Sequence, residues 1–544
     1  MQSKSLTKQT LVQGALILTV AAMVVRLLGA VYRIPLGRML GDEGMGIYMF
    51  PNQFYWLFFT ISSAGIPVGV ARLVAAKVSV GMYRDAYRTF KIFLYTMMGA
   101  GLLFSLTLFF GAGWFVKIGI VPNPHSLYGL QVISPIVFFA AVTAAYRGLF
   151  QGLQNMSAVA ASQVGEQIML VIGTLLFSYL LLPRGLAMAA AGGNFGAVPG
   201  AVAATLIMVY IYYRNRPELQ QLINEDRTTG REGAWSLMKK VFVISVPISL
   251  ASMSMAVNNI IDSVIIINRL QLASYSLERA TALYGQLSGF AMSFINISIA
   301  FSLSLGTSIV PSVAEAFTIK NHRAVENRIS QAIRLSILTS LPAAAGLFVL
   351  APQLTLLVFA NKDAGIPLAA IAPAIVFWGT NLVFNGALQG LGRADIPVKN
   401  LLAGLAFKIS ITYFLTPTAL GIRAAALGTV VMYTVASLLN ILAIKRLIGF
   451  SFNITDGLLR PGLATAIMAW GTWEVYSLAY SLTGHNSPAS LIAILAGMII
   501  YALAILLIGG IRADDINRLP FIRRAYPLLQ AYETWKEKII NKLR

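Results

Sequence analysis

Apolar stretches of about 20 residues recur along the whole chain and are separated by short polar connections. About 20 apolar residues in helical form cross the hydrocarbon core of a bilayer. The pattern therefore predicts an all-α polytopic membrane protein with fourteen transmembrane helices. We place the spans at 11–32, 49–76, 92–116, 127–150, 159–182, 187–213, 241–268, 281–311, 329–350, 366–391, 398–417, 421–444, 461–482 and 488–511.

Composition supports this prediction and excludes several kinds of catalytic and metal site. Hydrophobic residues make up 57% of the 544 residues and charged residues only 11%, far from the balance of a soluble domain. The absence of cysteine excludes disulfides, thiolate metal sites and thiol nucleophiles. The three histidines are scattered, and no P-loop motif occurs. We therefore expect no cofactor, and expect transport to be driven by the membrane potential or by a Na+ or H+ gradient.

The net charge of +21 is distributed in a way that indicates topology. Basic residues concentrate in alternate connections, including 214–240, and in the tail 512–544. Because cytoplasmic loops carry the excess of Lys and Arg, both termini are predicted to lie in the cytoplasm. The charge is thus explained by the membrane, and a nucleic-acid partner is not expected.

An internal repeat divides the chain. Gly148-Leu-Phe-Gln-Gly-Leu153 recurs six predicted helices later as Gly386-Ala-Leu-Gln-Gly-Leu391. Since six is even, the copies have the same orientation, which predicts two lobes related by an axis along the membrane normal around a central cavity. We predict an N-terminal lobe (1–213), a cytoplasmic linker (214–240), a C-terminal lobe (241–447), two further helices (448–511) and a tail (512–544). The tail is either an amphipathic helix on the inner leaflet or a solvated helix against a loop.

Charged residues at membrane depth are candidates for function, because each costs about 2.5–3.5 kcal/mol to insert. Arg26 and Arg33 are seven residues apart and share a helical face, so they are candidate phosphate ligands. Arg72 shares a face with Gly65 and Gly69, which would leave room for a ligand or a close helix. For Arg33 and Arg72 the alternative is that the side chain reaches to the membrane interface.

The predicted span 241–268 carries a polar stripe that is disfavoured against lipid. It should line the cavity or pack on the other lobe. Within it, Asp262 is a candidate to bind a coupling cation or to pair with an arginine. The stripe consists of Ser245, Ser249, Ser252, Asn259, Asp262 and Arg269.

Glu166 and Lys408 lie in the middle of their predicted spans, on related faces of helices that the repeat aligns. We predict that they pair in one conformational state or respond to protons or ions during transport. The alternative is a static buried ion pair.

The segment from Arg26 to Tyr48, RLLGAVYRIPLGRMLGDEGMGIY, resembles the polysaccharide-biosynthesis branch of the multidrug/oligosaccharidyl-lipid/polysaccharide (MOP) flippase superfamily. The similarity is to the stage V sporulation protein B and YtgP group of Gram-positive bacteria, which is related to the MurJ lipid II flippases, and it covers essentially the whole chain. It is also specific at QGLGRADIP (389–397) and LGTSIVP (305–311). Arg26 matches a first-span arginine of the family, whereas Tyr32 and Tyr55 stand where the family has basic residues.

The resemblance implies a V-shaped pair of six-helix lobes plus two C-terminal helices, flipping a lipid-linked anionic oligosaccharide, lipid II, by alternating access. We expect a monomer among membrane lipids, beside cell-wall synthesis enzymes, with roles in cell shape and sporulation. The alternatives are a flippase for another lipid-linked oligosaccharide or a sporulation-specific precursor, a drug/cation antiporter, a membrane glycosyl- or phosphotransferase, and a non-transporting scaffold. We do not expect an enzyme.

Overall fold

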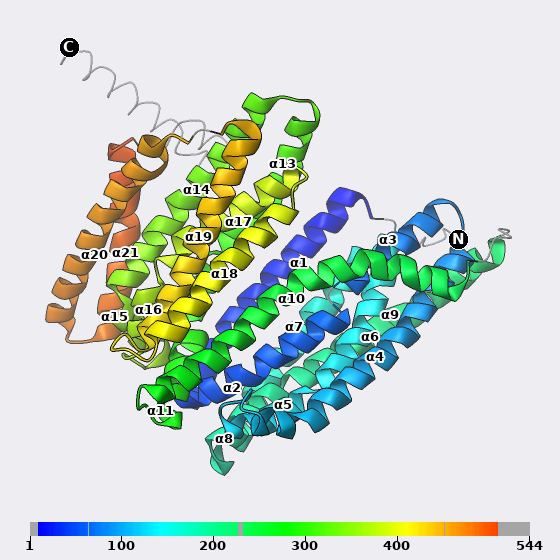
Figure 1. Ribbon diagram of the computed structural model, residues 1–544, viewed down its shortest axis with the longest axis horizontal. Helices are drawn as coiled ribbons and strands as arrows, with labels where there is room; N and C mark the ends of the chain where they lie inside the picture. Colours follow the sequence, from blue (N-terminus) through cyan, green and yellow to red (C-terminus); the bar gives the residue numbers. More distant parts are fainter. Residues whose placement is uncertain (1–8, 64, 227–231, 451, 510–544) are drawn as a thin grey trace. The chain divides into compact units, whose positions relative to one another are not determined.

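The computed structural model describes residues 9–63, 65–226, 232–450 and 452–509, and within these residues it is helical, without strands (Figure 1). The first helices are α1 (Leu11–Val31), α2 (Arg33–Ser63), α3 (Ile66–Ser79), α4 (Tyr83–Lys117), α5 (Leu127–Ile133), α6 (Pro135–Gly152), α7 (Met156–Leu181), α8 (Leu186–Phe195), α9 (Ala197–Glu225), α10 (Ala234–Leu272) and α11 (Leu277–Gly285). The later helices are α12 (Met292–Ser298), α13 (Ala300–Thr318), α14 (His322–Val349), α15 (Ala351–Phe359), α16 (Gly365–Ile371), α17 (Ala374–Gly390), α18 (Asp395–Leu415), α19 (Ile422–Ile448), α20 (Arg460–Thr483) and α21 (Asn486–Leu507). Short 3-10 and π turns lie at Pro124–Ser126 (η1), Leu182–Arg184 (η2), Gln286–Ala291 (η3) and Thr455–Leu459 (η4).

The helices fall where the apolar pattern places them. Side-chain caps set several starts, as at α7, where Asn155 accepts a hydrogen bond from the backbone of Ala158. Among the described residues, ten helical segments are long and apolar enough to cross a membrane, or eleven if α16 and α17, bent by 43°, form one broken span. A polytopic helical membrane protein is therefore confirmed, and the number fourteen stays a prediction.

The boundaries differ from the prediction at three breaks. Residues 33–48 were expected to connect two spans but belong to α2, which bends at Gly41, where φ is 64°. The predicted span 49–76 is divided between the end of α2 and α3. The predicted span 281–311 contains the π turn η3 and a boundary between α12 and α13. Hydropathy does not reveal these boundaries, because α2 continues as a helix through the polar residues around Gly41, whereas the π turn η3 lies within an apolar run.

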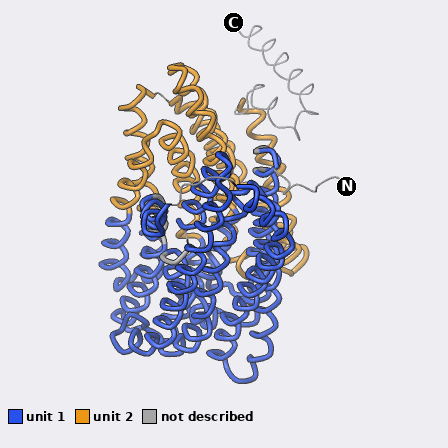
Figure 2. The backbone as a smooth tube through the Cα atoms, turned by 90° about the vertical axis from the view of Figure 1, so that its right-hand side faces the viewer, with its two compact units in different colours: residues 1–297, 358–368, 405–429 blue, residues 298–357, 369–404, 430–544 orange. Residues whose placement is uncertain are grey.

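The chain divides into two compact units, coloured separately in Figure 2. Unit 1 contains residues 1–297, 358–368 and 405–429, and unit 2 contains residues 298–357, 369–404 and 430–544. The lobes 1–213 and 241–447, the linker 214–240 and the two helices 448–511 stay predictions. The tail 512–544 lies outside the described residues.

The sequence repeat lies at an equivalent close contact between two helices in each unit. In unit 1, Gly148 and Gly152 of α6 lie against α3, where an added Cβ would come within 2.9 Å and 2.6 Å of Val70 and Val74. In unit 2, Gly386 and Gly390 of α17 lie against α13 in the same way, on Gly306 and Val313. Glycine at this spacing lets two helix backbones approach closely, so the repeat encodes a helix contact.

Each unit has its own core. In unit 1, Phe90, Phe93 and Phe150 are fully buried between α3, α4, α6 and α9. In unit 2, the core lies between α13, α14 and α17, and α20 packs along α21 (Figure 1). Many large apolar side chains are exposed, such as Phe110, Trp470 and Leu482, as expected for surfaces that face lipid.

Candidate functional site

An ion pair of unit 1 joins α10 to α18. The Lys408 ammonium donates to the Asp262 carboxylate and, at 3.2 Å, to the Asn258 side-chain oxygen. Asn258 and Asp262 are four residues apart and therefore point the same way from α10. The Lys408 side chain is 5% exposed and that of Asp262 is 22% exposed. The pair neutralises two charges that would be costly to bury alone.

A polar cluster surrounds this pair. The Tyr284 hydroxyl, which is buried, lies in the electrostatic field of Asp262 and has Gln53, Ser263 and Ser288 as hydrogen-bonding neighbours. The cluster thus connects α10 and α18 with α2, α11 and the π turn η3. Asp262 was expected to bind a cation or an arginine, and in the structure the Lys408 ammonium occupies that position.

A second ion pair lies between α6 and α7. Arg147 donates to the Glu166 carboxylate at 2.7 Å and to the Ser162 hydroxyl at 2.9 Å. The Arg147 side chain is 16% exposed. Tyr55 of α2 lies in the electrostatic field of both charged groups. Glu166 and Lys408 were predicted to pair with each other in one conformational state or to respond to protons or ions during transport. In this structure Glu166 pairs with Arg147 and Lys408 with Asp262, and the prediction for the transport cycle stays a prediction.

Sequence reasoning missed Arg147 as a site residue. It lies inside the predicted span 127–150, directly before the repeat, so a charge within an apolar run was the available signal. In unit 2 the repeat places Asn385 at the corresponding position. Asn385 accepts a hydrogen bond from Asn440, which in turn accepts one from Asn400. The charged pair of one unit thus corresponds to an uncharged amide network in the other.

The predicted arginines of the first span lie in different surroundings. Arg26 is on α1 and is exposed, within an apolar helix. Arg33 is the first residue of α2, after α1 has ended at Val31, and is half-buried. Its Nε atom is buried and has no hydrogen-bond partner among the described residues. Arg33 therefore presents a guanidinium group that a ligand oxygen could satisfy.

Arg72 is exposed on α3, and the glycines beside it have another role. Gly65 and Gly69 pack against α10, where an added Cβ would overlap the Ser245 backbone carbonyl and hydroxyl. Ser249 accepts a hydrogen bond from the Gly65 backbone at 3.1 Å. The N-terminal part of the predicted polar stripe, Ser245 and Ser249, therefore packs against α3. The Ser252 side chain lies outside the described atoms.

In the C-terminal part of the stripe, Arg269 and Asn259 make different kinds of contact. The Arg269 guanidinium stacks over the Tyr413 ring of α18, 3.1 Å from the ring centroid. Asn259 is exposed and accepts a hydrogen bond from Asn258 at 3.3 Å. The structure thus brings together Asp262, Lys408 and Asn258, and within the described part of the chain the contacts of this pair involve none of Arg26, Arg33 and Arg72.

A third polar cluster, which the sequence did not suggest, lies at the bend of α2 beside Gly41. The Asp42 carboxylate accepts hydrogen bonds from Gln286 at 2.7 Å and Asn361 at 3.1 Å. Arg38 donates to the Val358 carbonyl at 2.7 Å. Three segments distant in sequence are thereby tied together within unit 1.

Ion pairs and polar clusters inside a bundle of apolar helices are the features of a membrane transporter, because such groups mark pathways for polar substrates and ions. A structure of a multidrug resistance MATE family transporter of the MOP superfamily, in an inward-facing conformation, superposes with a TM-score of 0.64 at 17% identity, over 80% of this chain and 98% of that one. The structure of the lipid II flippase MurJ in an inward closed conformation also gives 0.64, at 15% identity, over 89% and 97% of the two chains. The fold is that of the MOP superfamily.

The chain belongs to the polysaccharide biosynthesis protein family, whose model matches residues 11–317, more than half of the sequence. The MatE model matches residues 287–414. Stage V sporulation protein B of Bacillus subtilis (strain 168) is 28% identical over 522 residues, covering 95% of this chain and 99% of that protein. The lipid II flippase MurJ of the same organism is 24% identical over 460 residues, covering 82% and 84%. The resemblance found in the sequence is confirmed.

Proposed function

We propose that this protein is a flippase that moves an undecaprenyl-pyrophosphate-linked peptidoglycan precursor, lipid II, from the inner to the outer leaflet of the bacterial cytoplasmic membrane by alternating access. The observation that carries the proposal is Arg33, whose half-buried guanidinium keeps a buried Nε without a hydrogen-bond partner among the described residues. Guanidinium groups suit bidentate phosphate binding. Two similar proteins, stage V sporulation protein B and the lipid II flippase MurJ, support it.

Other basic side chains would also bind the substrate. Arg26 offers a second guanidinium seven residues before Arg33, and Arg72 and Arg269 are additional candidates, with Asn259 for the sugars or peptide. Arg147 lies near Tyr55, where the family resemblance leads one to expect a basic residue. We propose that Arg147 supplies the positive charge that Tyr55 lacks.

The acidic residues are better suited to coupling than to substrate binding. Asp262 and Glu166 are both paired with cations, Lys408 and Arg147. A transporter for cationic drugs needs accessible carboxylates, so these pairs disfavour that alternative. Exchange of partners at either pair is a means by which membrane potential, Na+ or H+ would drive the cycle, since moving one charge across 100 mV yields about 2.3 kcal/mol.

The test is delivery of lipid II to the outer face of cells depleted of their own flippase. We expect the wild-type protein to restore delivery, and Arg33→Ala and Arg26→Ala to lose it at matched expression. Arg184→Ala is the control, because Arg184 is an exposed arginine in the turn η2 between α7 and α8. Full delivery by both variants would refute the roles of the arginines.

A second candidate is a flippase for another lipid-linked oligosaccharide or a sporulation-specific precursor. It is favoured by the similarity to stage V sporulation protein B and to the sporulation protein YkvU of Bacillus subtilis (strain 168), which is 25% identical over 386 residues. A well-expressed wild-type protein that delivers no lipid II would favour this candidate. Spore cortex formation in a strain that lacks its own sporulation homologue would then be the assay.

A further inference from the structure

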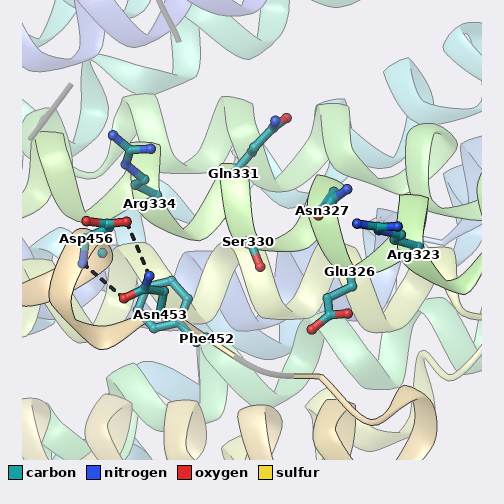
Figure 3. Close-up of a pocket in the computed structure, with 10 residues that line it drawn as sticks. Arg323, Glu326, Asn327, Ser330, Gln331, Arg334, Phe452, Asn453 and Asp456 are labelled. Carbon is teal, nitrogen blue, oxygen red and sulfur yellow. Dashed lines mark hydrogen bonds between the residues drawn. The ribbon is translucent and has the colours of Figure 1, made fainter. Parts of the chain in front are cut away.

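Polar side chains of unit 2 form a network where α20 begins. The Asn453 side chain donates to the Asp456 carboxylate at 3.2 Å (Figure 3). Arg460 pairs with the same carboxylate at 2.7 Å. Glu474, in the middle of α20, differs from these residues, because its side chain has no ion-pair or hydrogen-bond partner among the described residues.

The depth of Glu474 in the membrane follows from the packing of α20 on α21. α21 is one of the helices that are long and apolar enough to cross a membrane, whereas α20 by itself falls outside that set. The two helices run antiparallel, since Gly471 lies against Ile500 and Gly497 lies against Thr472. The same register places Glu474 level with the middle of the 22-residue α21. The carboxyl group therefore lies near the middle of the bilayer, away from the headgroups.

Glu474 is on the outer face of α20. The buried face of this helix consists of Pro461, Ala464, Thr465, Met468, Thr472 and Ala479. The opposite face carries six exposed residues at intervals of four, three, four, three and four, namely Leu463, Ile467, Trp470, Glu474, Ser477 and Ser481. This is the spacing of the a and d positions of a heptad, by which one helix contacts another over several turns.

The neighbouring helix α21 shows what a purely lipid-facing surface of this unit contains. Every exposed residue between 491 and 507 is apolar. The outer face of α20 instead presents one carboxyl group and two serine hydroxyl groups. Such groups are costly against lipid, and they form hydrogen bonds when a second helix covers them. The outer face of α20 is therefore suited to contact with another transmembrane helix.

The chemistry of Glu474 suits a second copy of the same helix. A carboxylate is far costlier in hydrocarbon than the neutral acid. The neutral acid has one O–H donor and one C=O acceptor, so two acids that face each other form two reciprocal hydrogen bonds. A second copy has the same topology and presents the same residue at the same depth, as contact across a two-fold axis requires.

We propose that the outer face of α20 is a dimerisation surface, on which Glu474 pairs with Glu474 of a second copy. We expected a monomer from the sequence, and Glu474 is the observation that favours two copies. The residues proposed for substrate binding and coupling all belong to unit 1, whereas α20 belongs to unit 2. The contact is thus independent of which lipid-linked precursor is transported.

Disulfide cross-linking in the membranes of expressing cells tests the proposal, because the chain has no cysteine of its own. Ser477→Cys places a thiol on the dimerisation surface. Leu495→Cys places one on the exposed face of α21 and is the matched control for random collisions. We expect mild oxidation to give about tenfold more dimer from Ser477→Cys. Equal dimer formation by the two variants would overturn the proposal.

Substitutions of Glu474 in the Ser477→Cys chain test the hydrogen-bonded pair. Glu474→Gln keeps a donor and an acceptor, so we expect cross-linking to persist. Glu474→Leu removes both, and dimer formation should fall about tenfold. Because Glu474 is exposed, neither variant should lower the melting temperature in detergent, which separates loss of the dimer from loss of the fold.

Two other outcomes would refute the pair. Unchanged cross-linking in Glu474→Leu would show that the carboxyl group does not hold the copies together. Loss of cross-linking in both Glu474→Gln and Glu474→Leu, at an unchanged melting temperature, would show that the ionised carboxylate is required. A basic transmembrane helix of another protein would then be the partner in place of a second copy.

Discussion

Lys408 of α18 and Asp262 of α10 form an ion pair in which the lysine side chain is almost fully buried. The two residues are 146 positions apart in the sequence, so the pair is a tertiary contact that requires both helices to be in place. Asn258 supplies a second acceptor to the ammonium. The pair therefore contributes to the specificity of helix packing as well as to any coupling role.

Removing one partner of this pair should destabilise the protein more than removing both. Asp262→Asn or Lys408→Met leaves a buried charge without its partner, at a cost of about 3–5 kcal/mol. The double variant buries no unpaired charge, so its melting temperature in detergent should lie above that of either single variant. A double variant less stable than both single variants would contradict the pairing.

The pair between Arg147 and Glu166 should behave differently because it is more exposed. Arg147→Gln leaves the Glu166 carboxylate and Ser162 without their donor, and we expect a loss of about 1–3 kcal/mol of stability. Arg147→Lys keeps the charge and loses the forked geometry that contacts both partners. If Arg147 also binds substrate, Arg147→Lys should reduce flipping at near-normal stability, measured by lipid II delivery at matched expression.

A stability loss without a flipping loss in Arg147→Lys would assign Arg147 a structural role only. Glu166→Gln is the companion variant, because it frees the Arg147 guanidinium while removing no cation. Flipping that survives Glu166→Gln and fails in Arg147→Lys would identify the arginine as the functional partner of the pair.

The sequence predicted the helices well because membrane insertion depends on local hydropathy. Every predicted span coincides with a helix or with consecutive helices, although hydropathy did not show that α2 continues through the polar residues around Gly41 or that a π turn lies at 286–291. The ion pairs were harder to predict. Glu166 and Lys408 were recognised as buried charges, but which cation meets which carboxylate depends on how helices rotate against one another. That information lies in contacts such as Gly65 with Ser245, which a single sequence does not display.

Glycines beside the Asp42 cluster should be intolerant of alanine. In Gly285→Ala the new methyl group would overlap the Asp42 backbone carbonyl, and in Gly46→Ala it would overlap that of Thr281. Because these neighbours are backbone atoms, α2 and α11 must separate, and we expect a loss of about 1–3 kcal/mol for each variant. Gly99→Ala in α4 is the control: nothing lies within 4 Å, and helix propensity should raise stability by up to about 1 kcal/mol.

Thermal unfolding of the three alanine variants in one detergent checks this expectation. Gly285→Ala and Gly46→Ala should melt below the wild type and Gly99→Ala at or above it. Equal melting temperatures for Gly99→Ala and Gly285→Ala would show that α2 and α11 do not approach as closely as the structure has them.

A cluster at the start of α10 should make stability depend on acidic pH. Glu232, in the connection before α10, pairs with Lys240 at 2.8 Å and Lys77 at 3.7 Å, and the hydrogen bond from Lys240 lowers the pKa of the Glu232 carboxyl below its usual 4.5. Since a lowered pKa favours the folded state while the carboxylate is charged, this stabilisation is present above pH 4.5 and is lost as the pH falls through the lowered value. Glu232→Gln should therefore melt below the wild type at pH 7, and the two curves should converge under acid. Glu225→Gln, which removes the same charge from an exposed position on α9, should show no such convergence, and parallel curves for wild type and Glu232→Gln at every pH would contradict the pairing.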